Sequence, residues 1–199
     1  MTRKARISVV ILLPLLLLSA SYLYTQESHN FHPITEGEAY RSAQLDREEF
    51  EYYIDTYNIK SIINLRGKNP EASWYREELA VSAERHVEHY DIALSSSHRP
   101  SREDVRRLIE IFRTAQRPVL IHCLAGADRS GLAAAMWKVI VDKEPKSEAE
   151  KQLSIRYWHL PVGKACALDR FFSKWERRVG ELQRIEQEML SGKLENNPP

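Results

Sequence analysis

The sequence predicts an α/β domain with a small, mainly parallel central sheet that helices flank on both faces. Short apolar segments alternate with amphipathic ones between residues 39 and 157, as they do where helices join parallel strands. The length of 199 residues suits one compact domain with a sizeable core. A hydrophobic content of 43% is too high for a disordered chain.

Charge and cysteine content exclude several classes of protein. The chain has 29 Lys and Arg against 28 Asp and Glu, and we expect no nucleic-acid partner because such proteins need a clear basic excess. Two cysteines cannot form a disulfide framework, and no Cys/His group has the spacing of a zinc finger. We therefore expect no metal site.

The N-terminal segment 1–24 predicts a membrane anchor or a signal peptide. Arg3, Lys4 and Arg6 precede an uncharged 18-residue stretch from Ile7 to Tyr24, near the short end of the about 17–25 apolar residues that span a bilayer as a helix. Small residues around Ala20 offer a cleavage site, whereas the apolar character beyond them favours an anchor. Either reading places the domain on the non-cytosolic side, which is the periplasm in a bacterium.

Four regions follow from this pattern. Residues 25–38 are polar and without periodicity, which indicates a linker or an extended lead-in, with histidines that are solvated rather than metal-bound. The folded domain is expected over 39–190, and a frayed tail over 191–199. The last part of the domain, from residue 147, is expected to be wholly helical, in two helices over 147–157 and 165–190.

The period of the apolar residues assigns the elements within the domain. Apolar residues at 50, 53, 54 and 57 predict a helix over 46–57 with Asp46 as its N-cap. Ser101, with Asp104 three residues later, indicates the start of another helix. Further helices are expected over 74–84 and after residue 131, and strands over 60–65, 87–94 and 119–121.

The segment most informative about chemistry runs from His122 to Gly131 and reads HCLAGADRSG. It joins an apolar strand to a helix, and such a tight loop directs several main-chain N–H groups into one concavity with a helix N-terminus behind it. The concavity suits a tetrahedral dianion and stabilises a Cys123 thiolate. Arg129 offers a planar fork for two phosphate oxygens, and Gly126 permits close approach of the backbone.

Two further side chains of this segment have expected roles. Ser130 can donate a hydrogen bond to the sulfur and help it leave in a second chemical step. His122 is expected to orient the loop through hydrogen bonds to the backbone rather than to act as a base.

This string resembles the signature loop of the cysteine-dependent protein phosphatases, in their small dual-specificity branch. The resemblance extends over 39–157, and the segments AYRS at 39–42 and IINLR at 62–66 are similar to exported bacterial tyrosine phosphatases. It implies a dual-specificity phosphatase-like fold, and attack of Cys123 on phosphorus to form a phosphocysteine that water hydrolyses. No metal or organic cofactor is implied. The substrate-binding residues are then Leu124, Ala125, Gly126, Ala127 and Ser130, with Arg129 stabilising the transferred group.

The general acid that protonates the leaving oxygen has three candidates. Asp128 stands beside Arg129, and a similar Asp occurs within the loop of some bacterial relatives. A salt bridge or a hydrogen bond that stabilises the loop is the alternative role for Asp128. Asp91 has the sequence spacing usual for the family's acid but lies within a predicted strand, and His98 lies in a Ser-rich loop. The order of preference is Asp128, Asp91, His98.

Other side chains are candidates for the entrance of the site. Arg66 and Lys68 follow a strand end, where ligands bind in open α/β sheets, and are expected to contact substrate. The sequence does not orient the remaining candidates, which are Arg41, Arg99, Arg102, Trp158, His159 and Lys164. Cys166 would form a reversible redox switch if it paired with Cys123 in an oxidising compartment; the alternative is a small buried residue on the last helix.

The predicted function is hydrolysis of phosphomonoesters, with protein phosphotyrosine as the first expected substrate. A phosphoinositide or inositol phosphate phosphatase of the same mechanism is one alternative, and a phosphate-binding module that has lost turnover is another. The expected partners are a phosphorylated protein or a small phosphomonoester, together with a membrane through residues 7–24.

Overall fold

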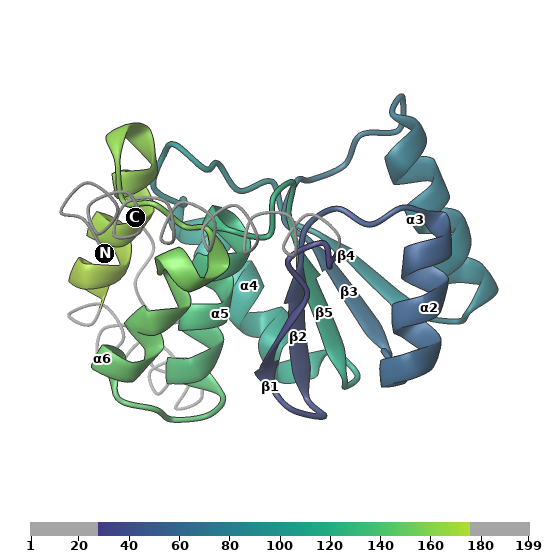
Figure 1. Cartoon of the computed structure of the whole chain (residues 1–199), viewed down its shortest axis with the longest axis horizontal. Coiled ribbons are helices and arrows are strands. Elements are labelled where there is room, and N and C mark those ends of the chain that lie inside the picture. Colours follow the sequence, from purple (N-terminus) through teal and green to yellow (C-terminus); the bar gives the residue numbers. More distant parts are fainter. Residues whose placement is uncertain (1–27, 176–199) are drawn as a thin grey trace, which may run out of the picture.

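The computed structural model describes residues 28–175. A five-stranded sheet in the order β1-β2-β5-β3-β4 stands between two groups of helices (Figure 1). Strand β1 is antiparallel to β2, and all other neighbours are parallel. The predicted mainly parallel sheet is thus confirmed. The strands are β1 His32–Thr35, β2 Ala39–Ser42, β3 Ser61–Asn64, β4 Glu88–Asp91 and β5 Val119–His122.

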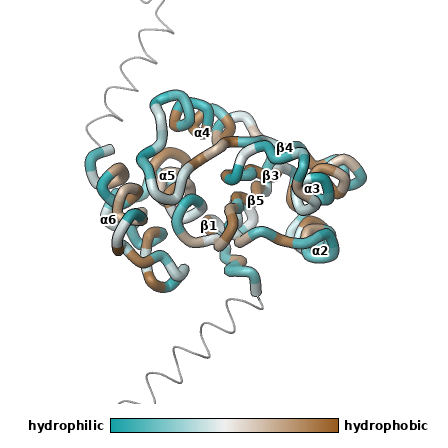
Figure 2. The backbone as a smooth tube through the Cα atoms, turned by 90° about the horizontal axis from the view of Figure 1, so that it is seen from above, coloured by the Kyte–Doolittle hydropathy of each residue, from teal (hydrophilic) through white to brown (hydrophobic). Residues whose placement is uncertain are grey.

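Helices cover both faces of the sheet, as predicted. Helices α2 (Arg47–Tyr57) and α3 (Ser73–Glu84) lie on one side, and α4 (Arg102–Thr114), α5 (Asp128–Ile140) and the short α6 (Lys146–Ala149) on the other (Figure 2). Strand β5 is buried along its whole length. Its alternate side chains therefore enter two separate cores, and Leu120 packs under α2 and α3 while Ile121 packs under α4 and α5.

Two helices begin at the expected capping residues. Asp46 accepts a hydrogen bond from the Glu49 N–H, and the Glu49 side chain accepts one from the Asp46 N–H. Ser101 and Asp104 form the same reciprocal pair at the start of α4. Each pair satisfies two main-chain N–H groups that a helix leaves unpaired at its start, which fixes where the helix begins.

The expectation of a linker over 25–38 is wrong for its second half. Residues 32–35 form β1, an edge strand in which Ile34 is only 4% exposed. Four residues are too few to show a hydrophobic period, so the pairing with β2, rather than a sequence pattern, defines this strand. The folded domain begins before residue 39.

The expected helix over 147–157 is also wrong. Helix α6 ends at Ala149 and is followed by two 3₁₀ turns, Glu150–Gln152 and Ile155–Tyr157. The main-chain carbonyls of Gln152 and Tyr157 accept hydrogen bonds from side chains of the β1–β2 region instead of from a helix. Side chains far away in sequence thus interrupt a segment whose local pattern is helical.

The last described helix follows a 3₁₀ turn at Gly163–Ala165 and occupies residues 166–175. Its side chains Leu168, Phe172 and Trp175 join the core beneath α4 and α5, as its apolar stripe predicts. Its expected continuation to residue 190, the tail 191–199 and the apolar segment 7–24 lie outside the described residues. Within 28–175, no helix is long and apolar enough to cross a membrane, and the anchor stays a prediction.

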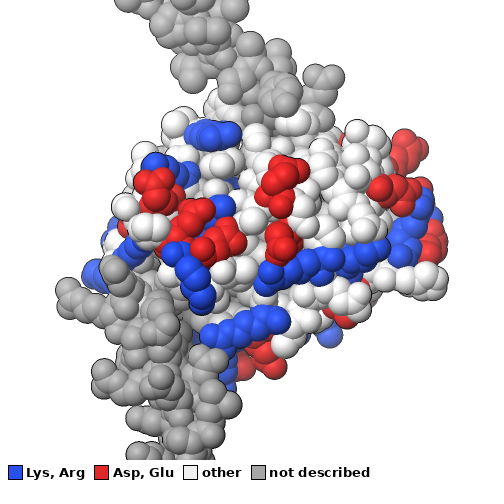
Figure 3. Space-filling view, turned by 90° about the horizontal axis from the view of Figure 1, so that it is seen from below, with Lys and Arg blue, Asp and Glu red and all other residues white. Residues whose placement is uncertain are grey.

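The parallel strands end together at one edge of the sheet, uppermost in Figure 1, where the segment after β5 passes to α5. The view from below (Figure 3) shows the opposite end of the molecule, where basic and acidic side chains are mixed. A phosphate site is therefore to be sought at the upper edge, where ligands bind in sheets of this kind.

The burial of β5 sets a test of the fold. Leu120→Ala removes a fully buried side chain between the sheet and helices α2 and α3. We expect it to lower the free energy of unfolding by about 2–5 kcal/mol, measured by urea denaturation. Leu79→Ala, at a position of α3 that is 39% exposed, should change it by less than about 1 kcal/mol. Equal effects of the two substitutions would contradict this arrangement of the core.

Candidate active site

The catalytic loop, residues 123–129, follows the carboxyl end of β5. Cys123 is its first residue, only 2% exposed, with its sulfur 3.5 Å from the hydroxyl of Ser130 in the first turn of α5. The ends of β2 and β3 flank it, because Ser42 and Asn64 are both in register with His122. The thiol thus lies at the bottom of the loop, with a helix N-terminus beside it.

Four consecutive carbonyl groups of the loop are held on its outer side. The carbonyl of Leu124 accepts from the Gln44 N–H at 3.2 Å, and that of Ala125 accepts from Nδ2 of Asn30 at 3.1 Å. The other two, of Gly126 and Ala127, both accept from Nη2 of Arg41 at 2.9 Å.

The contacts that fix these carbonyls leave the main-chain N–H groups of residues 124–127 unused. Among the described residues, these four groups donate to no partner. Uncompensated donors gathered around a thiol form a site for a tetrahedral anion. The binding role of Leu124, Ala125, Gly126 and Ala127 stays a prediction, and this arrangement is compatible with it.

Arg41 supports the loop from below. It is completely buried, donates to the Gln152 carbonyl at 2.8 Å, and stacks on the Tyr157 ring at 4.3 Å. Burial lowers the pKa of Arg41 to about 10, which still leaves it protonated at neutral pH. The expectation that Arg41 lines the entrance is therefore wrong. It lies under the loop because β2, which carries it, is buried along its length.

Gly126 occupies the position where the loop passes closest to β2. Its φ of 65° lies in the left-handed region, and a Cβ placed there would be 2.6 Å from the Ala43 nitrogen and 2.7 Å from the Ser42 carbonyl carbon. No other residue fits without moving the backbone. The close approach expected of this glycine is present, and it is directed at β2.

Two guanidinium groups lie at the rim. Nε of Arg129 is buried and has no hydrogen-bond partner among the described residues, while Nη1 reaches the Leu65 carbonyl at 3.4 Å. Arg66 donates to Oε1 of Gln44 at 2.7 Å and covers the Trp74 ring at 3.5 Å. Burial and the neighbouring charge of Arg129 both lower the pKa of Arg66. The structure thus brings Arg66 beside Arg129, whereas Lys68 is exposed. The substrate contacts expected of both residues stay a prediction.

His122 contacts a carboxylate rather than the loop backbone. Its Nε2 lies 2.9 Å from Oε1 of Glu78, an oxygen that also lies 2.7 Å from Nε2 of His89. Burial opposes ionisation of Glu78, but the charge of His122 and hydrogen bonds from His122, His89 and Gln44 hold its pKa well below the usual range. The expected backbone hydrogen bonds are absent within 28–175, where Nδ1 of His122 has no partner. The histidine is oriented from α3.

Asp128 takes part in a chain of three charged side chains. Its Oδ1 lies 2.8 Å from Nδ1 of His159, and Nε2 of His159 lies 3.1 and 3.2 Å from the carboxylate oxygens of Asp169. His159 is fully buried, whereas the side chains of Asp128 and Asp169 are each 31% exposed. The salt bridge proposed as the alternative role of Asp128 is therefore present, and His159 borders the loop.

Both carboxylate oxygens of Asp91 accept hydrogen bonds from neighbouring side chains. Its two oxygens accept from Nδ2 of Asn64 at 2.8 Å and from the hydroxyl of Tyr75 at 2.7 Å. Strand β4 is two strands away from β5, roughly 10 Å at the usual strand spacing. These contacts disfavour Asp91 as the acid.

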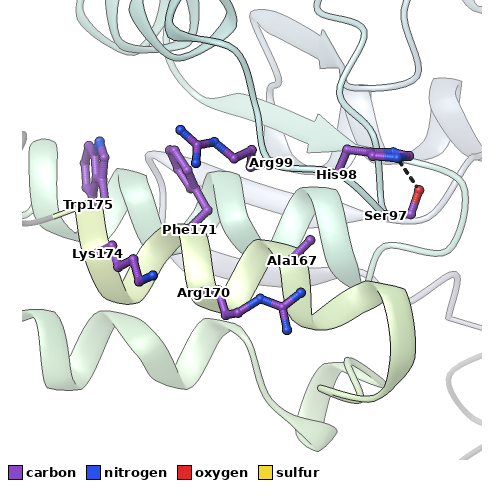
Figure 4. Close-up of a pocket in the computed structure, with 8 residues that line it drawn as sticks. All are labelled: Ser97, His98, Arg99, Ala167, Arg170, Phe171, Lys174 and Trp175. Carbon is purple, nitrogen blue, oxygen red and sulfur yellow. Dashed lines mark hydrogen bonds between the residues drawn. The ribbon is translucent and has the colours of Figure 1, made fainter.

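His98 lines a cavity of about 370 Å³ between the Ser-rich loop and the helical residues 166–175. Figure 4 shows its ring turned toward Ser97, to whose hydroxyl Nδ1 is hydrogen-bonded at 3.0 Å. No residue of the catalytic loop lines this cavity. Asp128 is thus the candidate acid that the structure places within the catalytic loop itself.

The two cysteines are separate in the structure. Both are free, and the thiol of Cys166 donates to the Pro161 carbonyl at 2.8 Å. The conditional bridge to Cys123 is not formed, and the last helix holds Cys166 at an intermediate level of burial.

Several residues of the site were not found from the sequence. Glu78 gave the clearest signal, because this charged residue occupies the buried face of α3 together with Tyr75 and Val81. A carboxylate on an apolar helix face needs a polar partner. His122, the residue before the signature cysteine, could have been expected to be that partner. Asn30 and Asp169 gave no comparable signal, since each meets its partner only through the fold.

The contacts of Arg41 lead to a prediction about the loop. Arg41→Lys keeps the charge but cannot reach the carbonyls of Gly126, Ala127 and Gln152 together. We expect kcat/KM for 4-nitrophenyl phosphate to fall about 100-fold, because small displacements of catalytic groups cost that much. Circular dichroism checks that the variant is folded, and activity within about twofold of wild type would show that the carbonyls need no such support.

Comparisons with known proteins agree with this fold. The catalytic core of the Saccharomyces cerevisiae PP-IP phosphatase Siw14 superposes with a TM-score of 0.62 at 22% identity, covering 80% of this chain and 91% of that one. Pseudomonas aeruginosa TpbA gives 0.56 at 18% identity, covering 74% and 85%, and PTPMT1 gives 0.57 at 15%, covering 76% and 99%. At such identities the likeness shows the fold. The sequence profile of a family matches residues 18–188, most of the chain, and the chain therefore belongs to the family described as DSP-PTPase phosphatase fused to NAD+ kinase, within the cysteine-dependent dual-specificity and tyrosine phosphatases.

Proposed function

We propose that this protein hydrolyses phosphomonoesters through a phosphocysteine on Cys123, and that phosphotyrosine in a protein is its first substrate. One observation carries the proposal: four carbonyls of the loop are bound by groups outside it, whereas its four N–H groups and the buried Nε of Arg129, in the same short segment as a buried thiol, have no partner among the described residues. Donors placed in advance around a dianion are worth most in such a desolvated position.

In the first step the Cys123 thiolate attacks phosphorus in line with the leaving oxygen. The three equatorial oxygens receive hydrogen bonds from the loop N–H groups and from Arg129, which also hold the group in the course of transfer. The P–O bond breaks as the S–P bond forms, and the leaving oxygen takes a proton from the carboxyl group of Asp128.

In the second step water attacks the phosphocysteine. The Asp128 carboxylate takes a proton from this water, and the S–P bond breaks to return the thiolate and inorganic phosphate. The hydroxyl of Ser130, 3.5 Å from the sulfur, donates to the leaving thiolate. The chain's own side chains supply every proton transfer.

Two features support an aromatic phosphate ester as substrate. Trp74, stacked with Arg66, borders a hollow of about 280 Å³ together with Gln44 and Asp46. The carboxylates of Glu49 and Glu77 line the same hollow. Their negative charge would repel a second phosphate on that side, whereas a peptide carries no such charge. TpbA, which shares the fold, has been seen in complex with pTyr.

The second candidate is a substrate with more than one phosphate, and its support is the basic lining of the cavity beside the Ser-rich loop, which lies outside the catalytic loop itself. Arg99, Arg170 and Lys174 line it and form no ion pair with any described residue (Figure 4). Siw14, with the same fold, is named a PP-IP phosphatase. An inositol phosphate or phosphoinositide therefore belongs in the same experiment.

A substrate panel tests the reaction and separates these candidates. Wild type and Cys123→Ser are assayed for phosphate release from phosphotyrosine peptides, inositol phosphates and phosphoinositide vesicles. We expect turnover by wild type and a loss of at least about 1,000-fold in the serine variant, because its hydroxyl is not ionised at neutral pH. A serine variant as active as wild type would exclude cysteine catalysis. A preference for the inositol compounds would instead select the second candidate.

The role of Asp128 is tested with leaving groups of different acidity. Asp128→Asn should lose about 100-fold in kcat/KM with phenyl phosphate, because phenolate needs a proton as it leaves. With 4-nitrophenyl phosphate the loss should be below about fivefold, because nitrophenolate leaves without one. The matched control is Asp142→Asn, which changes a carboxylate paired with Lys138 beyond the end of α5. Equal losses on both substrates would remove Asp128 from the acid role.

A further inference from the structure

His159 is a fully buried histidine whose two ring nitrogens both face carboxylates. Nδ1 meets Asp128, in the first turn of α5, at 2.8 Å, and Nε2 meets Asp169, on the helical residues 166–175, at 3.1 and 3.2 Å. The charges that influence the pKa of His159 are those of these two carboxylates, one from α5 and one from the helical residues 166–175.

This geometry determines the protonation state of the ring. A neutral imidazole has one donor and one acceptor nitrogen, so it would turn a lone pair toward one of the two carboxylates. The imidazolium donates to both. Burial alone would lower the pKa of His159, but the hydrogen bonds that the ring donates to Asp128 and Asp169, together with their negative charges, outweigh burial and raise this pKa above its ordinary value of 6.5.

We propose that His159, anchored by Asp169, is a positioning residue for the general acid: it fixes Oδ1 of Asp128 and leaves Oδ2 as the oxygen that exchanges the proton with substrate. This inference rests on the proposed function, in which Asp128 protonates the leaving group. His159 touches neither the thiol nor the phosphate and acts through the aspartate.

The positive charge of His159 also changes the energetics of the step. When Oδ2 gives its proton to the leaving oxygen, Asp128 becomes a carboxylate, and the adjacent imidazolium stabilises the negative charge that forms. In the second step Oδ2 takes a proton from water while Oδ1 stays bound to the ring, so His159 keeps its own protons throughout. Arg41, beneath the loop, also interacts with the charge of Asp128, and it remains when His159 is replaced.

A purely structural role makes a different prediction. If His159 only packs the segment after α6 against α5, its replacement should lower activity equally for all leaving groups and leave the shape of the pH profile unchanged. If it positions and stabilises Asp128, the loss should depend on the leaving group. The basic limb of the profile should also move, because the replacement removes a positive charge beside the carboxyl group that acts as the acid.

The experiment measures kcat/KM against pH, with phenyl phosphate and 4-nitrophenyl phosphate, for wild type, His159→Gln and Asp169→Asn. We expect His159→Gln to lose about tenfold with phenyl phosphate and under about threefold with 4-nitrophenyl phosphate, a part of what a general acid contributes. Asp169→Asn should shift the same limb in the same direction by less, since it keeps the ring but removes its anchor. His86→Gln, at an exposed histidine before β4, is the matched control and should behave as wild type.

A second measurement does not depend on turnover. Nuclear magnetic resonance of the imidazole in Cys123→Ser protein should show His159 titrating above pH 6.5, and at lower pH once Asp128→Asn or Asp169→Asn is added. Titration of His159 below pH 6.5 without these changes would overturn the proposal, as would an unshifted limb with equal losses on both substrates. Absence of turnover by wild type would refute the proposed function instead, and the titration would still decide whether the bridge exists.

Discussion

The direction of four carbonyl groups is the constraint on which the site depends. A main-chain turn that wraps around an anion has as many carbonyls as N–H groups, and the carbonyls repel the anion if they point inward. Arg41 holds two of them on the outer side, and its buried guanidinium also binds the Gln152 carbonyl. The loop is therefore shaped by a cation that never meets the substrate.

This arrangement is costly in isolation, because it buries several charges in a small volume. Arg41, Glu78 and His159 are each fully shielded from solvent, and an unpaired charge in such a place would be strongly destabilising. Each is compensated locally: Arg41 by carbonyls, Glu78 by two histidines and Gln44, and His159 by two aspartates. Arg41 and His159 contact the loop itself, and Glu78 holds His122 immediately before it, so the geometry of this region is determined from several elements.

The helix starts, the buried strand β5 and the catalytic loop could be predicted from the sequence, each for its own physical reason. The capping boxes at Asp46 and Ser101 and the buried run at β5 are local patterns, and the structure confirms them. The HCLAGADRSG string placed the thiol and Arg129 in one loop because a strand-to-helix turn leaves few other shapes. The supporting residues could not be found in this way, since Arg41 and Asn30 reach their partners across long stretches of chain, and Asp169 meets His159 only through the turns of the chain between them. The break of the expected helix after α6 has the same cause: its carbonyls bind to distant side chains.

Asn30 has a consequence for where this domain begins. It lies ahead of the first strand, in the stretch expected to be a linker, yet its buried amide reaches the Ala125 carbonyl in the loop and the Tyr157 carbonyl across from it. The segment that leads in from the N-terminal side thus supports the outer side of the catalytic loop. A truncation that started at the first strand would remove a support of the loop while leaving every catalytic side chain in place, and such a shortened protein would be folded yet impaired.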